Sequence, residues 1–151
     1  MAQSLSKLFV HIVFHTKHNK KFIISDIKNE VYAYMGAIIK DNDSIPIIIN
    51  GVEDHVHILC VMSKNIALSK LVELVKKNSS RWIKTKGNYY RNFGWQNGYA
   101  AFSVSPSEHD EVKNYIVGQE THHKKVTFKE EYIELLKQHG IEYKEDYLWT
   151  D

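Results

Sequence analysis

Two histidines separated by one residue form the first candidate site in the chain. His55 and His57 belong to the segment HVHILCVM, which is typical of a strand, so both imidazoles point to one face with Cα atoms about 7 Å apart. Neutral imidazoles at this spacing can share one divalent cation, although two cannot complete its coordination. Asp54 could join or orient these ligands, whereas Cys60 is expected to face the opposite side as core filler. A pair of histidines that hydrogen-bond to backbone at a strand edge is the plainer alternative.

A tyrosine and a glutamine four residues apart form the second candidate site. Helical spacing in the segment VKNYIVGQ places Tyr115 and Gln119 on one face. An amide oxygen is a ligand suited to Mg²⁺ or Mn²⁺, and a tyrosine oxygen can act as a covalent nucleophile. If this face packs over the strand of His55 and His57, metal and nucleophile lie side by side. Taken alone, the two residues are equally consistent with a half-buried aromatic ring and a surface amide.

Hydrophobic periodicity predicts the elements that must position these side chains. Strands are expected over residues 8–15, 45–50, 55–62 and 99–105, and helices over 25–40, 66–86, 108–122 and from 127 to about 140. The expected helix caps are Ser25, the pair Ser107 and Asp110, and the pair Thr127 and Glu130. Asn50 with Gly51 is expected to begin a hairpin turn, and Gly140 is expected to end the last helix.

The order of these elements is β-α-β-β-α-β with two C-terminal helices. This predicts an α+β protein with a ferredoxin-like antiparallel sheet and helices packed against it. In the first strand, Ile12 and Phe14 point to one face, while His11, Val13 and His15 point to the other. Gly118 weakens the helix that carries Tyr115 by about 1 kcal/mol relative to alanine, which could give that helix mobility.

Length and composition place the chain among ordinary globular proteins. Its 151 residues, 43% hydrophobic and 25% charged, predict one domain over residues 1–151 with a real core. The single cysteine excludes a disulfide framework and a cysteine-rich zinc site. No apolar run approaches the roughly 20 residues of a membrane span, and the first residues do not resemble a signal peptide. We therefore expect a cytoplasmic protein with no membrane partner.

The charge distribution is more informative than the formal net charge of +2. Residues 64–91 hold eight basic side chains against one acid, and residues 130–151 hold seven acids against two lysines. This asymmetry suggests one basic face that could meet a polyanion, although a solvated helix face would look the same. Lys76, Lys77, Arg81 and Lys84 could follow DNA phosphates, and aromatic residues of the next loop, Tyr90 and Trp95 among them, could stack on unpaired bases.

Taken together, five sequence blocks resemble a known family, the HUH tyrosine transposases. Its members include single-strand-transposing insertion-sequence enzymes and their relatives associated with repetitive extragenic palindromes. The blocks are HIVFHTK (residues 11–17), EDHVHIL (53–59), KNSSR (77–81), WQNGY (95–99) and YIVGQ (115–119). A histidine-x-histidine pair alone is a weak motif, but five blocks in this order are much more specific.

The resemblance implies roles for particular residues. His55, His57 and Gln119 match the family's ligands for Mg²⁺ or Mn²⁺, and Tyr115 matches its nucleophile, which attacks a phosphate of single-stranded DNA and forms a 5′-phosphotyrosine link. Lys17, in the first block, is an expected DNA contact. The resemblance also implies recognition of DNA hairpin ends and a homodimer, in which Tyr115 could serve the metal site of its own or of the other chain.

Three alternatives stay open at this point. One is a domesticated relative with the same nicking and joining chemistry, and another is a binding module for single-stranded nucleic acid without catalysis. The third is an unrelated small metalloenzyme that uses only the two histidines. His122 and His123, just past Gln119, are interpreted as a solvated helix end, with a place in the lining of the site as the lesser alternative.

Overall fold

Four antiparallel strands form the single sheet of the computed structural model, which describes residues 2–150. They are β1 (Leu8–His15), β2 (Ile45–Val52), β3 (His55–Met62) and β4 (Ala100–Val104). Their order is β2-β3-β1-β4, so β1 and β3 lie at the centre and pair with each other along their whole length. The predicted ferredoxin-like arrangement is confirmed.

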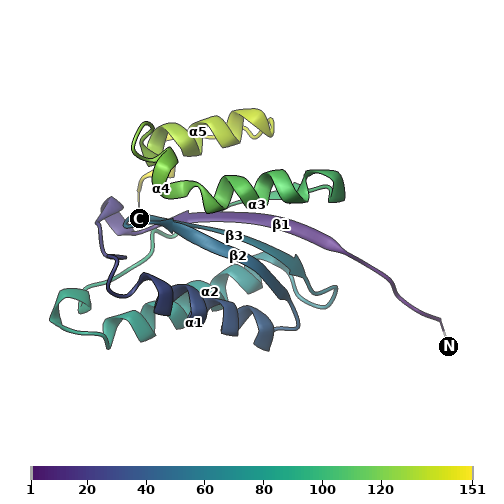
Figure 1. Ribbon diagram of the computed structural model, residues 1–151, viewed down its shortest axis with the longest axis horizontal. Coiled ribbons are helices and arrows are strands. Elements are labelled where there is room, and N and C mark those ends of the chain that lie inside the picture. The colour runs from purple at the N-terminus through teal and green to yellow at the C-terminus, as the bar shows by residue number, and fades with distance from the viewer. Residues whose placement is uncertain (1, 151) are drawn as a thin grey trace.

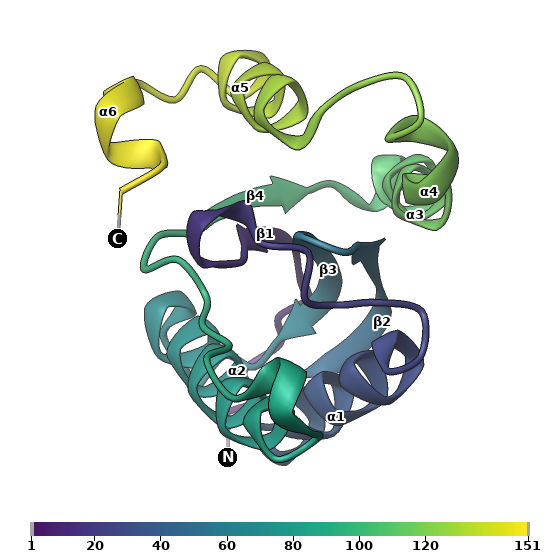
Figure 2. The same ribbon diagram turned by 90° about the vertical axis from the view of Figure 1, so that its left-hand side faces the viewer.

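Helices cover both faces of this sheet (Figures 1 and 2). Below it in Figure 1 lie α1 (Lys28–Asp41) and α2 (Leu68–Lys84). Above it lie α3 (His109–Val117), α4 (Gln119–His122) and α5 (Phe128–Gln138), and α6 (Glu145–Leu148) follows near the C-terminus. Short 3₁₀ turns occupy Lys17–Asn19, Asn88–Tyr90 and Pro106–Glu108.

The alternation of β1 divides the interior into two cores. Ile12 and Phe14 join the larger core against α1 and α2, whereas Val13 joins a smaller one against α5. His11 and His15 are buried and share the face of Val13, as the period of two requires. The sheet therefore presents its histidines to the layer that contains α3, α4 and α5.

The start of α1 differs from the prediction. The helix begins at Lys28, and Ser25 does not cap it, because the backbone forms a tight turn just before the helix. The amides of Ile27 and Lys28 both donate to the carbonyl of Ile24 and supply the hydrogen bonds that a cap would have supplied. The second helix, α2, is also shorter than predicted by two residues at each end.

The hairpin turn lies later than the Asn50–Gly51 pair. Both residues are inside β2, and the turn is at Glu53 and Asp54. A Cβ atom on Gly51 would lie 2.1 Å from the carbonyl oxygen of His55, so glycine is needed here for close approach of the paired strand. The sequence signal was therefore a packing requirement and not a turn.

The C-terminal helices confirm one predicted cap and correct another. Thr127 and Glu130 form the expected capping box, and Gly140, with φ of 64°, follows the end of α5. Ser107 and Asp110 form no such box, because Pro106–Glu108 is a 3₁₀ turn and α3 starts after it. The predicted helix over residues 108–122 is interrupted at Gly118, which separates α3 from α4.

Candidate metal and nucleophile site

Three buried histidines from the two central strands form the floor of the site. His55 and His57 on β3 have no exposed surface, and His11 on β1 is also buried. The antiparallel register places His57 opposite Val13, two positions from His11. The pair that the sequence predicted to share a face therefore does so, on the side covered by α3, α4 and α5.

A carboxylate from α5 lies at the centre of the histidines. The Oε1 atom of Glu131 is 3.1 Å from Nε2 of His57, 3.3 Å from Nε2 of His55 and 2.9 Å from Nε2 of His123. One donor atom from each of the four residues lies within 4.8 Å of all the others, an arrangement that could hold a metal ion. We call these four residues the His–Glu cluster.

The outer nitrogen of each histidine in the His–Glu cluster also has a partner. Nδ1 of His55 is 2.8 Å from a carboxylate oxygen of Asp54, and Nδ1 of His123 is 2.8 Å from the carbonyl oxygen of Val126. Nδ1 of His57 is 2.8 Å from Nε2 of His11. Such contacts fix the ring orientation and are typical of histidines that bind metals.

Tyr115 and Gln119 reach the same centre from the other side. The hydroxyl of Tyr115 donates to Oε2 of Glu131, and the amide nitrogen of Gln119 donates to the same oxygen at 2.9 Å. The amide oxygen of Gln119 lies 3.1 Å from Nε2 of His55. Asn50, on β2, holds α3 in place by donating to the carbonyl of Ile116 at 2.9 Å. The structure thus brings the predicted nucleophile and all three predicted ligands together within one chain.

The electrostatics of the site follow from burial and from these contacts. Burial opposes ionisation of Glu131, but hydrogen bonds from His123, His55 and His57 outweigh it and hold the pKa of this carboxyl well below its usual range. Burial likewise disfavours a charged His55, yet its hydrogen bonds to Asp54 and Glu131 raise its pKa to about 9. The cluster therefore pairs an ionised carboxylate with a protonated imidazole at neutral pH.

Two neighbouring groups are held neutral. Burial, and then the charge of Glu131, raise the pKa of the Tyr115 phenol. Burial, and then the neighbouring His57, lower the pKa of His11 to about 3. A cation placed beside Glu131 would offset the effect of that carboxylate on Tyr115.

Glu131 is the site residue that sequence reasoning missed, and His123 had been named only as a lesser alternative for the lining of the site. Glu131 had been counted with the acidic C-terminal segment, and His123 with a solvated helix end, yet both side chains are almost entirely buried. A signal for Glu131 was present, because it lies three residues after Phe128 and four before Leu135 on the buried face of α5. A charged residue within an apolar helical stripe indicates a buried polar partner.

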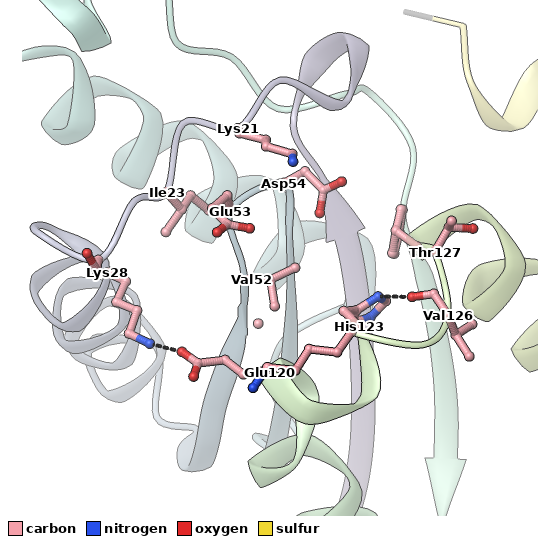
Figure 3. A pocket seen from close by; sticks show the side chains of 14 residues that line it. Lys21, Ile23, Lys28, Val52, Glu53, Asp54, Glu120, His123, Val126 and Thr127 are labelled. Carbon is pink, nitrogen blue, oxygen red and sulfur yellow. Dashed lines mark hydrogen bonds and ion pairs between the residues drawn. The ribbon is translucent and has the colours of Figure 1, made fainter.

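A pocket opens beside the His–Glu cluster (Figure 3). Its volume is about 550 Å³, and Asp54 and His123 belong both to its wall and to the site. Lys21, Lys28 and Lys124 also line it. Lys28 pairs with Glu120 across the opening, as the dashed line in Figure 3 marks.

The predicted phosphate contacts fall into two groups. Lys77, Arg81 and Lys84 are exposed on α2, which packs on the sheet face opposite to the His–Glu cluster, and Lys17 is exposed just after β1. Lys76 differs, because its ammonium group donates to the carbonyl of Gly98 at 2.9 Å and lies 5.4 Å from the centre of the Phe14 ring. Burial lowers its pKa to about 8, so Lys76 contributes to packing instead of facing solvent.

The predicted base-stacking residues Tyr90 and Trp95 are buried, which corrects that expectation. The Trp95 indole donates to Ser79 at 3.0 Å and packs edge-on against Phe14 and Phe93, because the loop folds its aromatic rings into the larger core. Neither ring presents a face to solvent. Tyr89 is the exposed aromatic residue of this loop, with 58% of its surface accessible.

Comparison with known proteins identifies the family of this chain. The family model described as "Transposase IS200 like" matches residues 4–119, so the chain belongs to the IS200-like transposase family. Searching curated proteins gives no match. No helix within the described residues 2–150 is long and apolar enough to cross a membrane.

Two solved structures share the fold. A candidate transposase from Deinococcus radiodurans R1 aligns with a TM-score of 0.62 at 19% identity, over 79% of this chain and 98% of that one. A REP-associated tyrosine transposase bound to a REP hairpin aligns with a TM-score of 0.62 at 12% identity, over 83% of this chain and 74% of that one. At these identities the likeness establishes the fold.

The neutral His11 makes the stability of the protein depend on pH. Below its ordinary value of 6.5, unfolded His11 takes up a proton that the folded residue, with a pKa of about 3, does not. The contribution of neutral His11 to the free energy of unfolding is therefore fully present above pH 6.5. It is lost as the pH falls toward 3, at up to about 1.4 kcal/mol per pH unit. Wild type and His11→Gln can be treated with chelator and unfolded with urea between pH 6.5 and 4. As the pH falls, the free energy of unfolding of the wild type should decrease at this rate relative to that of the variant. A constant difference would contradict the assignment.

Proposed function

We propose that this transposase is a metal-dependent enzyme that cleaves and rejoins single-stranded DNA, with Tyr115 as its nucleophile. One observation carries the proposal: the phenol of Tyr115 and the side chains of His55, His57 and Gln119 converge on the same buried centre in one chain. Because positioning and charge neutralisation dominate phosphoryl transfer, this arrangement supplies what the reaction needs.

The donor set suits a divalent cation. Two imidazoles and an amide oxygen, with Gln119 Oε1 only 3.1 Å from His55 Nε2, are neutral ligands for Mg²⁺ or Mn²⁺. Such an ion would supply the positive charge that polarises the scissile phosphate. Asp54 would hold the ring of His55 in position through its Nδ1 atom.

Tyr115 would perform the covalent step. Its oxygen bonds to phosphorus as the bond from phosphorus to the 3′-oxygen breaks, which leaves a 5′-phosphotyrosine and a free 3′-hydroxyl after the phenol loses its proton and the 3′-oxygen gains one. Phenolate, with a pKa near 10, is a better leaving group than an alkoxide. A second 3′-hydroxyl can therefore reverse the step and join strands.

The pocket beside the His–Glu cluster would receive the DNA. Its volume of about 550 Å³ suits an unpaired nucleotide, and its lysines Lys21 and Lys124 could contact phosphates, whereas Lys28 already pairs with Glu120. The similar structure that is bound to a REP hairpin supports DNA hairpin ends as the substrate. We also propose a homodimer in which each chain uses its own Tyr115, since one chain already holds both the nucleophile and the ligands.

The exposed basic residues of α2 would bind DNA away from the chemistry. Lys77, Arg81 and Lys84 lie on the face opposite to the His–Glu cluster, so a DNA molecule that reaches both must pass around the sheet. Lys17 is exposed just after the end of β1 and could also contact the DNA.

A triple variant tests the basic face. Replacing Lys77, Arg81 and Lys84 with alanine should weaken binding of a hairpin oligonucleotide and make it less dependent on salt. Each phosphate contact releases about one counterion, so each contact that is lost lowers the slope of log affinity against log salt concentration by about one. Fluorescence anisotropy at several salt concentrations measures this. Lys7, Lys137 and Lys144, replaced together, are the control, and equal slopes for both triple variants would contradict the assignment.

Tyr115→Phe tests the nucleophile. Wild type with Mn²⁺ and a labelled single-stranded hairpin oligonucleotide should form a covalent adduct on a denaturing gel, and the variant should form at least 100-fold less, because phenylalanine has no attacking oxygen. Tyr99→Phe, at a partly exposed tyrosine, should behave as wild type.

Each other outcome of this experiment has a distinct meaning. Undiminished adduct formation by Tyr115→Phe would contradict the role of this residue. Equal DNA binding by all proteins with no adduct from any would instead identify a binding module without catalysis. Strand cleavage that is indifferent to Tyr115 would indicate chemistry that uses the metal site without this tyrosine.

A further inference from the structure

Two residues of the His–Glu cluster lie outside the part of the chain that defines the family. The family match ends at Gln119, whereas His123 follows α4 and Glu131 belongs to α5. Both nevertheless reach the centre occupied by His55 and His57. The C-terminal segment therefore adds an imidazole and a carboxylate to the site that the family pattern does not include.

Nε2 of His123 needs either a proton or a metal ion where it faces the carboxylate of Glu131. The carbonyl of Val126 can only accept a hydrogen bond, so Nδ1 of His123 is the donor and a neutral ring has a bare lone pair on Nε2. That lone pair faces Oε1 of Glu131 at 2.9 Å. His55 differs, because its Nε2 atom lies 3.1 Å from the amide oxygen of Gln119, which can only accept a hydrogen bond. A lone pair that faces a carboxylate oxygen repels it unless a proton or a metal ion lies between them.

The spacing of the donor atoms suits a metal ion. Nε2 of His123, His57 and His55 lie 2.9, 3.1 and 3.3 Å from Oε1 of Glu131. Ligands about 2.1 Å from one ion are about 3.0 Å from one another at octahedral angles and about 3.4 Å at tetrahedral ones.

We propose that His123 and Glu131 are metal ligands together with His55 and His57, and that this site selects a transition ion such as Mn²⁺ or Zn²⁺ over Mg²⁺. The inference rests on the proposed function in taking the site to bind a divalent cation, and it goes beyond it in ligands and metal preference. Mg²⁺ favours octahedral oxygen coordination and retains water, whereas imidazoles suit transition ions. The α5 helix then completes the site from within the same chain.

Metal binding without DNA tests this directly. Chelator-stripped protein titrated calorimetrically should bind one Mn²⁺ or Zn²⁺ per chain at least tenfold more tightly than Mg²⁺. Glu131→Gln and His123→Ala should each weaken Mn²⁺ binding at least tenfold and change the electron paramagnetic resonance spectrum of the bound ion. Glu134→Gln, the same change at an exposed position of α5, and His109→Ala should bind Mn²⁺ within twofold of wild type. Circular dichroism in chelator establishes that each variant is folded.

Three results would overturn the proposal: Mn²⁺ binding by both cluster variants as tight as wild type, Mg²⁺ binding as tight as Mn²⁺, or tighter Mn²⁺ binding by Glu131→Gln, which would mean that Glu131 competes with the ion. Should Glu131→Gln fail to fold, His123→Ala decides. The Tyr115 adduct assay separates this inference from the proposed function. If the wild type forms the adduct and the cluster variants bind metal as the wild type does, only the ligand assignment is refuted. If the cluster variants bind metal more weakly but the wild type forms no adduct, only the transposase chemistry is refuted.

Discussion

The buried carboxylate of Glu131 against its ring of imidazoles is the interaction on which the second helical layer depends. An ionised carboxylate without partners would cost several kcal/mol in this environment, so α5 can dock only where the histidines of β3 receive it. Phe128 and Tyr132 add apolar contacts on both sides of Glu131. Tyr115 and Gln119 donate to the same carboxylate, which ties α3 and α4 to α5. One group thus organises the nucleophile, the candidate ligands and the helices that carry them.

The period of two along the central strands separates chemistry from stability. One face of β1 and β3 is apolar and packs on α1 and α2, while the other presents His11, His55 and His57. Changes to the imidazole face therefore leave the larger core in place. The same division sets the exposed cations of α2 apart from the nucleophile, so DNA recognition and DNA cleavage would occupy opposite faces of one small sheet.

What could be predicted from the sequence was local pattern. Strand alternation located β1 and β3, helical spacing located α2, and the Thr127–Glu130 box marked the start of α5. The fold, the shared face of His55 and His57, and the approach of Tyr115 and Gln119 followed from such patterns and from the family resemblance. The strands, the helices and the shared face of His55 and His57 are each encoded within a few neighbouring residues, whereas the approach of Tyr115 and Gln119 to that face followed from the family resemblance.

The features that were missed depend on contacts between distant segments. Glu131 looked like a solvated acid because its partners lie about 75 positions earlier in the chain, on β3. Gly51 looked like a turn residue because the carbonyl that approaches it is visible only once β2 and β3 pair. Trp95 looked available for stacking because a loop sequence does not reveal that Ser79 accepts a hydrogen bond from it inside the core.

A crystal structure of the protein with Mn²⁺, using the anomalous signal of the ion, tests the central claim most directly. The account predicts one anomalous peak within about 2.3 Å of Nε2 of His55 and of His57, with the Tyr115 hydroxyl of the same chain beside it. A peak located elsewhere, or a Tyr115 that approaches the ion only from a second copy of the chain, would contradict it.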